Sequence, residues 1–154
     1  MKTAAVIMLM GSALLVGCGT SKTPEATRAP SALPYYNFTG ALNSERAAVG
    51  LKSLRRDRAL DAIARRHAAD MTAQNFFSHV GSDGSTILKR VRRTGYNACY
   101  AAENIAWGQT SEAQVFREWH ESPGHRKNNL SKRADSYGLG RDGKNWVTVF
   151  AADC

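Results

Sequence analysis

The sequence lacks several features that would assign it to a familiar class at once. Its N-terminal apolar run, residues 4–16, is shorter than the roughly 20 residues needed to span a bilayer. Its three cysteines show no Cys-x-x-Cys spacing, and no internal repeat or nucleic-acid-binding motif is visible. Acidic residues are few, 13 against 21 Lys and Arg, so the formal net charge is +8. The chain is basic, but it has no mark of a nucleic-acid-binding protein or of a thiolate metal site.

The N-terminal segment has the organisation of an export signal. Lys2 precedes the apolar run and small residues follow it, so residues 1–17 are predicted to be a signal peptide. The segment LVGC at residues 15–18 resembles the lipobox of bacterial lipoproteins, whose cysteine becomes the acylated first residue. The alternative is an ordinary signal peptide that ends near a cysteine by chance. Gly19 stands where many enteric lipoproteins have an inner-membrane retention aspartate, so we expect Cys18 to anchor the protein in the outer membrane, facing the periplasm.

The remaining chain divides into a tether and one domain. Residues 18–35 are polar, contain three of the four prolines and show no hydrophobic period, as is typical of a flexible linker. Residues 36–154 are numerous enough to bury a core as one domain. Basic clusters could face anionic lipid, lipopolysaccharide or cell-wall polymer, or could be solvated helix surfaces. They lie at residues 52–58, 65–66, 89–93 and 126–133. Nucleic acid is not an expected partner of an exported lipoprotein.

Two cysteines remain once Cys18 is assigned to lipid. Cys99 and Cys154 would lie in an oxidising compartment, where a pair of cysteines usually forms a disulfide. We therefore expect a bridge between them, which would be worth about 4 kcal/mol in the chain-entropy treatment of a long loop. The alternative, a metal-thiolate or nucleophilic cysteine, has no supporting spacing.

Hydrophobic periodicity and polar caps predict four helices. They are expected near residues 38–49, 58–74, 86–94 and 112–121. Asp57, Ser85 and Ser111 can cap the second, third and fourth of these helices. Pro123 and Gly124 are expected to stop the fourth.

The C-terminal region changes to a strand-like pattern. Asp142-Gly143 separates two extended runs, the second of which contains WVTVF, and this arrangement predicts a β-hairpin. A purely helical fold is therefore not expected, and helices packed on a sheet are favoured, an α+β class.

Three short segments carry side chains able to do chemistry. They are FFSHV with His79, AENIAWG with Glu103, and WHESPGHR with His125, and each is expected at the boundary of an element, where side chains converge on clefts. Two imidazoles and a carboxylate are the ligand set of a catalytic zinc site and also a plausible acid–base set. Spacing alone does not show that the three groups meet.

The order of these motifs resembles that of a known family. FFSHV, a glycine turn, ENIAWG and W-x-x-SPGHR-x-N-x-L are similar to bacterial members of the CAP superfamily of cysteine-rich secretory proteins, antigen 5 and pathogenesis-related proteins, over residues 36–154. The resemblance implies an α-β-α sandwich, with an antiparallel sheet between helices and a central cleft that holds two histidines and two glutamates. His79, Glu103 and His125 match three of these four cleft positions.

The second cleft glutamate is where this chain departs from the family pattern. Ser122 occupies that position, and of the nearby carboxylates only Glu118 lies on nearly the same side of the helix at 100° per residue. Glu118 could replace the missing group or could be an ordinary exposed carboxylate. His67 lies on the apolar face of the second predicted helix and either lines the same cleft or simply packs.

Three functions are compatible with these residues. The first is a lipid-anchored extracytoplasmic binding module for a lipid, lipopolysaccharide or cell-wall polymer, with or without Zn²⁺ or another divalent cation. The second is a metal-dependent, peptidase-like hydrolase, in which His79 and His125 hold the ion and Glu103 takes a proton from bound water. The third is a purely structural envelope protein. Ser78 and Ser122 do not follow a strand-to-helix elbow, so neither is a convincing nucleophile, and whether the protein is an enzyme is left open.

Overall fold

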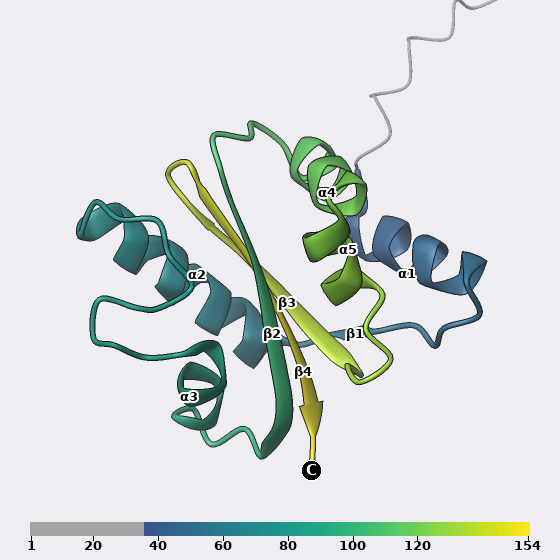
Figure 1. Cartoon of the computed structure of the whole chain (residues 1–154), viewed down its shortest axis with the longest axis horizontal. Coiled ribbons are helices and arrows are strands. Elements are labelled where there is room, and N and C mark those ends of the chain that lie inside the picture. Colours follow the sequence, from purple (N-terminus) through teal and green to yellow (C-terminus); the bar gives the residue numbers. More distant parts are fainter. Residues whose placement is uncertain (1–35) are drawn as a thin grey trace, which may run out of the picture. The chain divides into compact units, whose positions relative to one another are not determined.

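The computed structural model describes residues 36–154 as one unit of helices around a sheet (Figure 1). The elements are α1 (Phe38–Ala48), β1 (Arg55–Arg56), α2 (Arg58–Ala73), α3 (Ile87–Arg92), β2 (Ala98–Trp107), α4 (Glu112–Glu121), α5 (Pro123–Asn129), β3 (Ser136–Asp142) and β4 (Asn145–Asp153). The predicted signal peptide, Cys18 and the tether lie outside the described residues. Within residues 36–154, no helix has the length and apolarity needed to cross a bilayer.

Polar caps begin the helices close to where the sequence predicts. Asp57 accepts from the backbone N–H groups at the start of α2, and Ser111 accepts at the start of α4. The predicted Ser85 cap of α3 is wrong by one position, because Thr86 accepts from the backbone N–H of Lys89 instead. The backbone carbonyl of Ser85 instead accepts from Arg90 Nη1.

The segment after α4 differs from the prediction. Ser122 has extended dihedral angles and ends α4, but Pro123 then starts a further helix, α5, that the sequence analysis did not expect. Proline is well suited to the first turn, where its missing N–H removes no intrahelical hydrogen bond. His125 therefore lies in the first turn of α5 and not at the C-terminal end of α4.

The sheet has the strand order β1-β3-β4-β2, which makes β2 an edge strand. The predicted hairpin is confirmed: β3 and β4 pair antiparallel across a two-residue turn in which Gly143 has a positive φ of 53°. Short β1 pairs parallel with β3, a departure from a purely antiparallel sheet. The strand β2 was not predicted, and it places Glu103 within a strand, paired opposite Val149, instead of at an element boundary.

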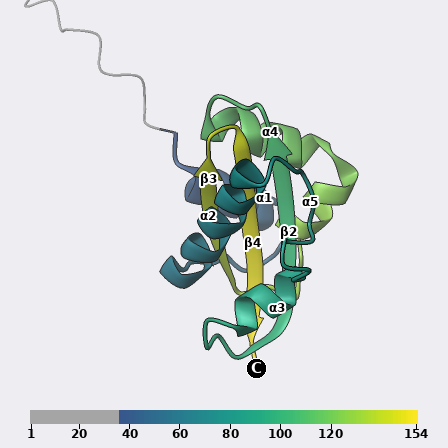
Figure 2. The same cartoon turned by 90° about the vertical axis from the view of Figure 1, so that its left-hand side faces the viewer.

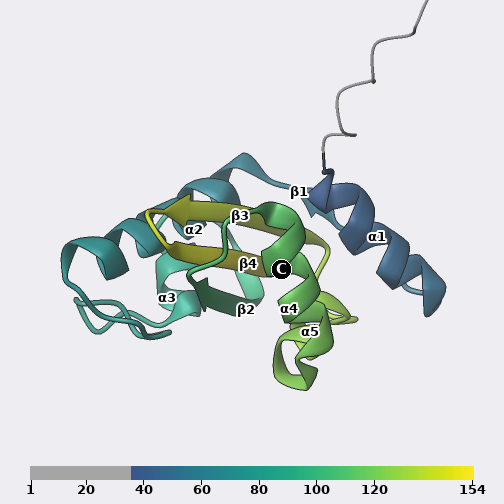
Figure 3. The same cartoon turned by 90° about the horizontal axis from the view of Figure 1, so that it is seen from above.

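Two cores lie on opposite faces of the sheet. Figures 1 and 3 show α2 and α3 on one face and α1, α4 and α5 on the other, and Figure 2 shows the sheet with α2 in front of it. Alternation along β4 divides its side chains between the faces, with Trp146 and Phe150 packing towards α1 and α4 and Val147 and Val149 towards α2. The structure is the α-β-α sandwich that the family resemblance implies.

Two glycines allow α2 to lie directly on β3. A Cβ atom at Gly138 would be 2.1 Å from the backbone carbonyl carbon of Leu60, and one at Gly140 would be 2.2 Å from the backbone nitrogen of Arg65. Both distances are far below van der Waals contact, and the opposing atoms belong to a helix backbone that cannot turn aside. The Gly-Leu-Gly segment of β3 thus fixes how close α2, which carries His67, comes to the sheet.

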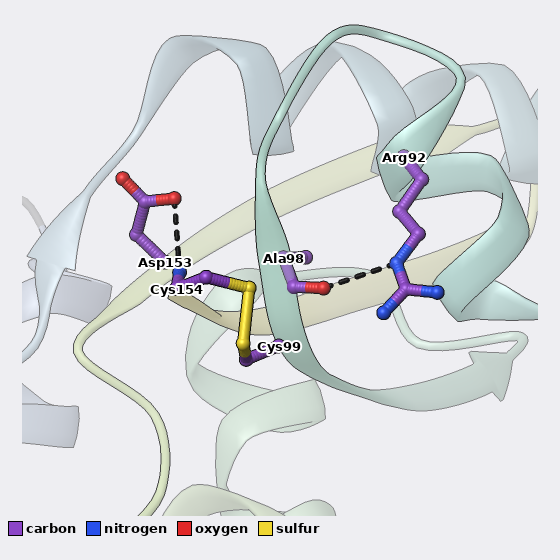
Figure 4. Close-up of a disulfide and its surroundings, with 5 residues drawn as sticks. All are labelled: Arg92, Ala98, Cys99, Asp153 and Cys154. Carbon is purple, nitrogen blue, oxygen red and sulfur yellow. Dashed lines mark hydrogen bonds between the residues drawn. A yellow bond between two sulfur atoms is a disulfide. The ribbon is translucent and has the colours of Figure 1, made fainter.

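The predicted disulfide is confirmed. Cys99 and Cys154 are bonded, with their Cα atoms 4.9 Å apart (Figure 4). Cys99 belongs to β2 and not to the loop expected before it, and Cys154 directly follows β4. The backbone N–H of Cys154 also donates to the carbonyl of Asn97 at 2.8 Å. The bridge joins the start of the edge strand to the C-terminal end of the chain.

Candidate functional site

The site forms at the free edge of β2. Successive side chains of a strand point to opposite faces, so Glu103 points towards α2 and α3 and Asn104 points towards α5. Because β2 has no neighbouring strand on its outer side, groups from both faces can meet around this edge. The loop that carries His79 and the first turn of α5, which carries His125, flank the strand there.

Glu103 is the centre of the site. Its side chain is buried, yet both oxygens have strong partners: Oε1 accepts from His79 Nδ1 at 2.8 Å, and Oε2 accepts from Arg90 Nη2 at 2.7 Å. The Nε2 atom of His67 lies 3.7 Å from Oε1. A buried carboxylate needs such compensation because its desolvation is costly. Both oxygens of Glu103 are therefore engaged, and the side chain orients its neighbours.

Arg90 stabilises the loop that carries His79. Besides its bond to Glu103, Nη1 of Arg90 donates to the backbone carbonyls of Ser85 at 2.7 Å and His79 at 3.1 Å. From the sequence alone, Arg90 is one member of the basic cluster at residues 89–93, and this role is not predicted. A helical signal was present, because Arg90 lies three residues after Ile87 and shares its inward side of α3.

His67 is packed inside the network. Its side chain is buried, and Nε2 must carry a proton because it faces the backbone carbonyl of Ser78 at 2.9 Å. Nδ1 is then unprotonated and has no partner among the described residues. Burial lowers the pKa of His67, followed in size by the opposing effect of Glu103, so the imidazole is neutral at neutral pH. Of the two sequence interpretations, packing is the one observed: His67 is buried beside Glu103 and does not line the cavity that His79 lines.

His79 is the exposed member of the network. Its side chain is 57 % exposed, while Nδ1 donates to Glu103. In a neutral imidazole this bond places the single proton on Nδ1, which leaves Nε2 as an acceptor that points away from Glu103. His79 thus presents an oriented ring nitrogen to a ligand.

His125 flanks this group from the other face of β2. It is half-buried, and its pKa is lowered by burial and, to a lesser extent, by the nearby His79, so it is neutral at neutral pH. Its backbone carbonyl accepts from Asn104 Nδ2 at 3.1 Å. Asn128 Nδ2 donates to Asn104 Oδ1 at 2.8 Å and to the backbone carbonyl of Glu103 at 3.1 Å. These two asparagines, which the sequence analysis did not single out, hold α5 against the free edge of β2.

Arg46 fixes the other end of α5. This guanidinium is almost fully buried, since the exposed fraction of the residue is 2 %, and burial lowers its pKa. It donates to the backbone carbonyls of Lys52, Asn129 and Ser131, each at 2.9 Å. Two of these carbonyls belong to the C-terminal end of α5 and the residues after it, where cations interact favourably with unpaired carbonyls. Helix α5 is therefore held at both ends.

A small cavity opens beside His79 and Glu103. It has a volume of about 330 Å³, and its lining includes His79, Glu103 and Asn128. His125 does not line this cavity, although it is close enough to His79 for their charges to interact. The structure therefore gathers His79 and Glu103 around one space, with His125 beside it.

Two weaker candidates lie apart from this group. Glu118 is exposed and accepts from the side-chain amides of Gln109 and Gln114, towards the start of α4. Ser122 begins α5 without a side-chain capping bond. Among the described residues, no hydrogen bond or ion pair joins either side chain to Glu103, so the structure does not bring Glu118 into the place of the missing glutamate.

The residues do not fit a zinc site with three or four protein ligands. Within residues 36–154, no group of three or more His, Cys, Asp or Glu side chains is arranged to hold a metal ion. Glu103, the carboxylate that lines the cavity, is committed to Arg90 and His79. Two imidazoles then remain at this edge of the sheet, fewer than the protein ligands of structural or catalytic zinc sites.

Solved structures share this fold. An extracellular protein of Bacillus anthracis that contains an SCP domain aligns with a TM-score of 0.72 and 28 % identity, over 75 % of this chain and 39 % of that one. An outer surface protein of Borrelia burgdorferi aligns with a TM-score of 0.69 and 20 % identity, over 75 % of this chain and 90 % of its own. Both of these proteins are thus described as extracellular or outer-surface proteins.

Sequence relatives and a family model complete the comparison. The uncharacterized protein YkwD of Bacillus subtilis is 34 % identical over 133 residues, which are 84 % of this chain and 52 % of YkwD. The uncharacterized membrane protein YlbC of the same organism is 31 % identical over 101 residues, 66 % of this chain and 29 % of YlbC. The chain thus spans about half or less of these relatives. The model of the cysteine-rich secretory protein family, CAP, matches residues 39–150, and the chain belongs to this family.

Proposed function

We propose that this domain is a binding module of the cell envelope, which recognises a polar group of its ligand through His79 and the cavity beside it. The observation that carries the proposal is the state of Glu103. Both of its oxygens are engaged, one by His79 and one by Arg90. The carboxylate therefore serves to orient the exposed imidazole and leaves His79 Nε2 free to meet a donor on a ligand.

The geometry disfavours the metal-dependent hydrolase. That mechanism requires a metal-bound water and a base that can take its proton. If Glu103 took the proton, it would lose the ion pair with Arg90 while both groups remain largely buried, which is costly. The described residues also lack a third protein ligand near the two histidines. Binding, with the histidines as hydrogen-bonding groups, needs neither condition.

The proposal includes a membrane anchor. Cys18 within the LVGC segment would carry the lipid, residues 18–35 would be the tether, and the domain would lie in the periplasm beneath the outer membrane. The ligand would then be a component within reach of such a tether: a lipid, lipopolysaccharide or cell-wall polymer. The basic charge of the chain supports an anionic component.

The experiment uses the chain from residue 19 onward and measures co-sedimentation with purified cell-wall sacculi and, separately, with anionic phospholipid vesicles. We expect binding to one of the two, weakened about tenfold or more by His79→Ala. His120→Ala is the matched control, because His120 is a histidine of α4 that pairs with Glu45, away from Glu103. Failure of the unmodified chain to bind either material contradicts the proposal, as does equal binding by His79→Ala.

The same incubation separates binding from hydrolysis. Sacculi and supernatant are compared with and without a chelator and with added Zn²⁺. We expect no soluble fragments in any condition. Release of fragments that stops with the chelator and with Glu103→Gln would replace the proposal by the hydrolase.

A further inference from the structure

A second hollow lies away from the His79 cavity, where the C-terminal end of α2, the β3–β4 turn and the end of β2 come together. Thr72 Oγ1 of α2 lies 3.2 Å from the carbonyl oxygen of Asp142 at the turn, which fixes these two elements side by side (Figures 1 and 3). The groove has a volume of about 700 Å³, within the range of sites for small ligands. His79, Glu103 and His125 do not line it.

The walls of the groove are aromatic and unusually exposed. Phe77 is 52 % exposed and Trp107 is 58 % exposed, which makes them two of the four exposed large apolar side chains among residues 36–154. Phe76 completes the aromatic wall, and the ammonium of Lys144 lies 5.0 Å from the centre of the Trp107 ring. Large apolar side chains gathered in one exposed hollow indicate a surface that is covered by a partner or ligand.

The base of the groove carries a polar group without a partner. Asn145 is only 6 % exposed, and its Nδ2 donates to Thr72 Oγ1 at 3.0 Å. Its Oδ1 has no donor in the described part of the chain. Buried acceptors of this kind are rare, because the lost hydrogen bond to water is not compensated. This oxygen is itself closed to solvent, so the polar side chains that a ligand in the groove can reach are those of Asn75 and Lys144, which line it and are exposed.

We propose that the groove binds a pyranose ring of an envelope polysaccharide. A sugar ring combines an apolar C–H face, which can stack on Trp107 or Phe77, with hydroxyl groups that can hydrogen-bond to Asn75 and accept from Lys144. An acyl chain would match the aromatic wall but would remove water from Asn75 and Lys144 without offering either a hydrogen bond. A flat membrane surface would meet protruding side chains, whereas these line a hollow.

The inference goes beyond the proposed function because it assigns a separate binding surface. The two surfaces are nevertheless connected along one short segment, Phe76-Phe77-Ser78-His79. The ring of Phe76 meets that of His67 edge-on, with centroids 6.4 Å apart, and His67 in turn lies beside Glu103.

The tryptophans of the chain provide a direct test. Trp119 and Trp146 are 1 % and 4 % exposed, so a change of emission on ligand binding reports Trp107. The probes are chitopentaose and cellopentaose, two soluble oligosaccharides of pyranose units, titrated into the chain from residue 19 onward. We expect a saturable blue shift with at least one of them, and affinity reduced about tenfold or more by Phe77→Ala. Val49→Ala is the matched control, since Val49 is 51 % exposed and lies at the end of α1.

The outcomes separate this inference from the proposed function. His79→Ala is expected to keep the emission shift, because His79 does not line the groove. Calorimetry on Trp107→Ala checks the loss of binding without the fluorescent reporter. The inference is overturned if neither oligosaccharide shifts the emission, if Phe77→Ala binds as well as the unmodified chain, or if anionic phospholipid vesicles give the shift and the oligosaccharides do not.

Discussion

At the residue scale, the site depends on one buried carboxylate that serves several neighbours. Glu103 accepts hydrogen bonds from His79 Nδ1 and from Arg90. Arg90 also donates to the backbone carbonyls of His79 and Ser85, at the two ends of the 79–85 loop. The same low-dielectric setting that strengthens these bonds makes the loss of one partner expensive. Changes at single positions should therefore affect both the fold and the presentation of His79.

Removing Arg90 should be strongly destabilising. In Arg90→Met the Glu103 carboxylate stays buried without its cation, and we expect the free energy of unfolding to fall by about 3–5 kcal/mol. Adding Glu103→Gln to this variant should restore part of the loss, since the uncompensated charge is gone. Urea denaturation measures both effects. Arg93→Met, which removes an exposed partner of Asp83, is the control and should change little; an equal loss in the two single variants would contradict the burial argument.

Acidification should destabilise the domain through its buried histidines. The pKa values of His67 and His125 are lowered in the folded protein, chiefly by burial, so below the unfolded value of about 6.5 only the unfolded chain takes up the proton. The contribution of the two histidines to the free energy of unfolding is therefore complete above pH 6.5 and falls as the pH drops towards their pKa values in the folded protein. The slope is at most about 1.4 kcal/mol per pH unit for buried His67, and it is smaller for half-buried His125, whose charge is screened by solvent.

The contribution of His67 can be separated by substitution. His67→Gln keeps a donor for the carbonyl of Ser78 but does not titrate, so the slope of unfolding free energy against pH between about 6.5 and 5 should become smaller. Urea denaturation at several pH values measures this slope. An unchanged slope in His67→Gln would show that His67 is not kept neutral by burial.

At the element scale, the packing of α2 on β3 controls the position of the whole α2 side of the site. The helix backbone lies so close to Gly138 and Gly140 that no side chain fits between them. His67 projects from this helix towards Glu103, and Asp61 of the same helix accepts from the backbone N–H of Leu139 at 2.8 Å. A shift of α2 away from the sheet would therefore separate His67 from the carboxylate.

Gly140→Ala should force such a shift. The added methyl group would overlap the α2 backbone, and overpacking of this kind costs about 1–3 kcal/mol or more. Thermal or urea unfolding measures the loss. Gly124→Ala in α5 is the matched control, because no atom lies within 4 Å of its added Cβ and its φ is not positive. Similar stability of the two variants would mean that α2 can move without cost.

Elements with a local signal were predictable from the sequence, and those without one were not. Helices α2 and α4 combine a polar cap with an apolar face, and the β3–β4 hairpin has its Asp-Gly turn. Helix α5 has no such signal, because PGHRKNN contains no apolar period and its stability comes from distant partners such as Arg46. Strand β2 was missed because its inward position 103 is a glutamate, whose burial depends on an arginine from α3.

The residues of the candidate site were likewise predictable only where a local sequence motif marks them. The resemblance to the CAP family pointed to His79, Glu103 and His125, and the structure places all three at the edge of β2. The motif SPGHR-x-N-x-L includes Asn128 but does not reveal its contacts, and Arg90 lies outside the motifs, because both roles depend on contacts between elements that are far apart in the sequence. Among the described residues, the missing second glutamate has no replacement at the site, since Glu118 turns towards Gln109 and Gln114.

At the scale of the whole molecule, the disulfide joins distant parts of the domain, and the predicted anchor would determine where the domain lies. The bridge closes a segment of the chain with a sequence separation of 55 residues, which includes α4, α5 and the β3–β4 hairpin. It also secures the outer strand β2, which has a neighbour on one side only.

Loss of the disulfide should lower stability without abolishing the fold. For Cys99→Ser/Cys154→Ser we expect a decrease of about 4 kcal/mol in unfolding free energy, from the larger entropy of the unfolded chain. Non-reducing peptide mapping of material from the cell envelope should find the two cysteine peptides joined. Free thiols at both positions in that material would contradict the bridge.

Membrane attachment should depend on a cysteine outside the folded domain. Cys99 and Cys154 are bonded to each other, so neither competes for Cys18, the cysteine of the LVGC segment that we expect to be acylated. Several acyl chains hold a protein firmly in a bilayer, because each buried CH₂ group contributes about 0.8 kcal/mol. Cys18→Ser should therefore move the protein from the membrane fraction to the soluble fraction.

The thermal unfolding of Cys18→Ser should match that of the same chain begun at residue 19, because the substitution leaves the domain core unchanged. If Cys18→Ser stayed with the membrane to the same extent as the unmodified protein, the lipid anchor would be wrong, and the basic surface or the aromatic groove would have to account for the attachment.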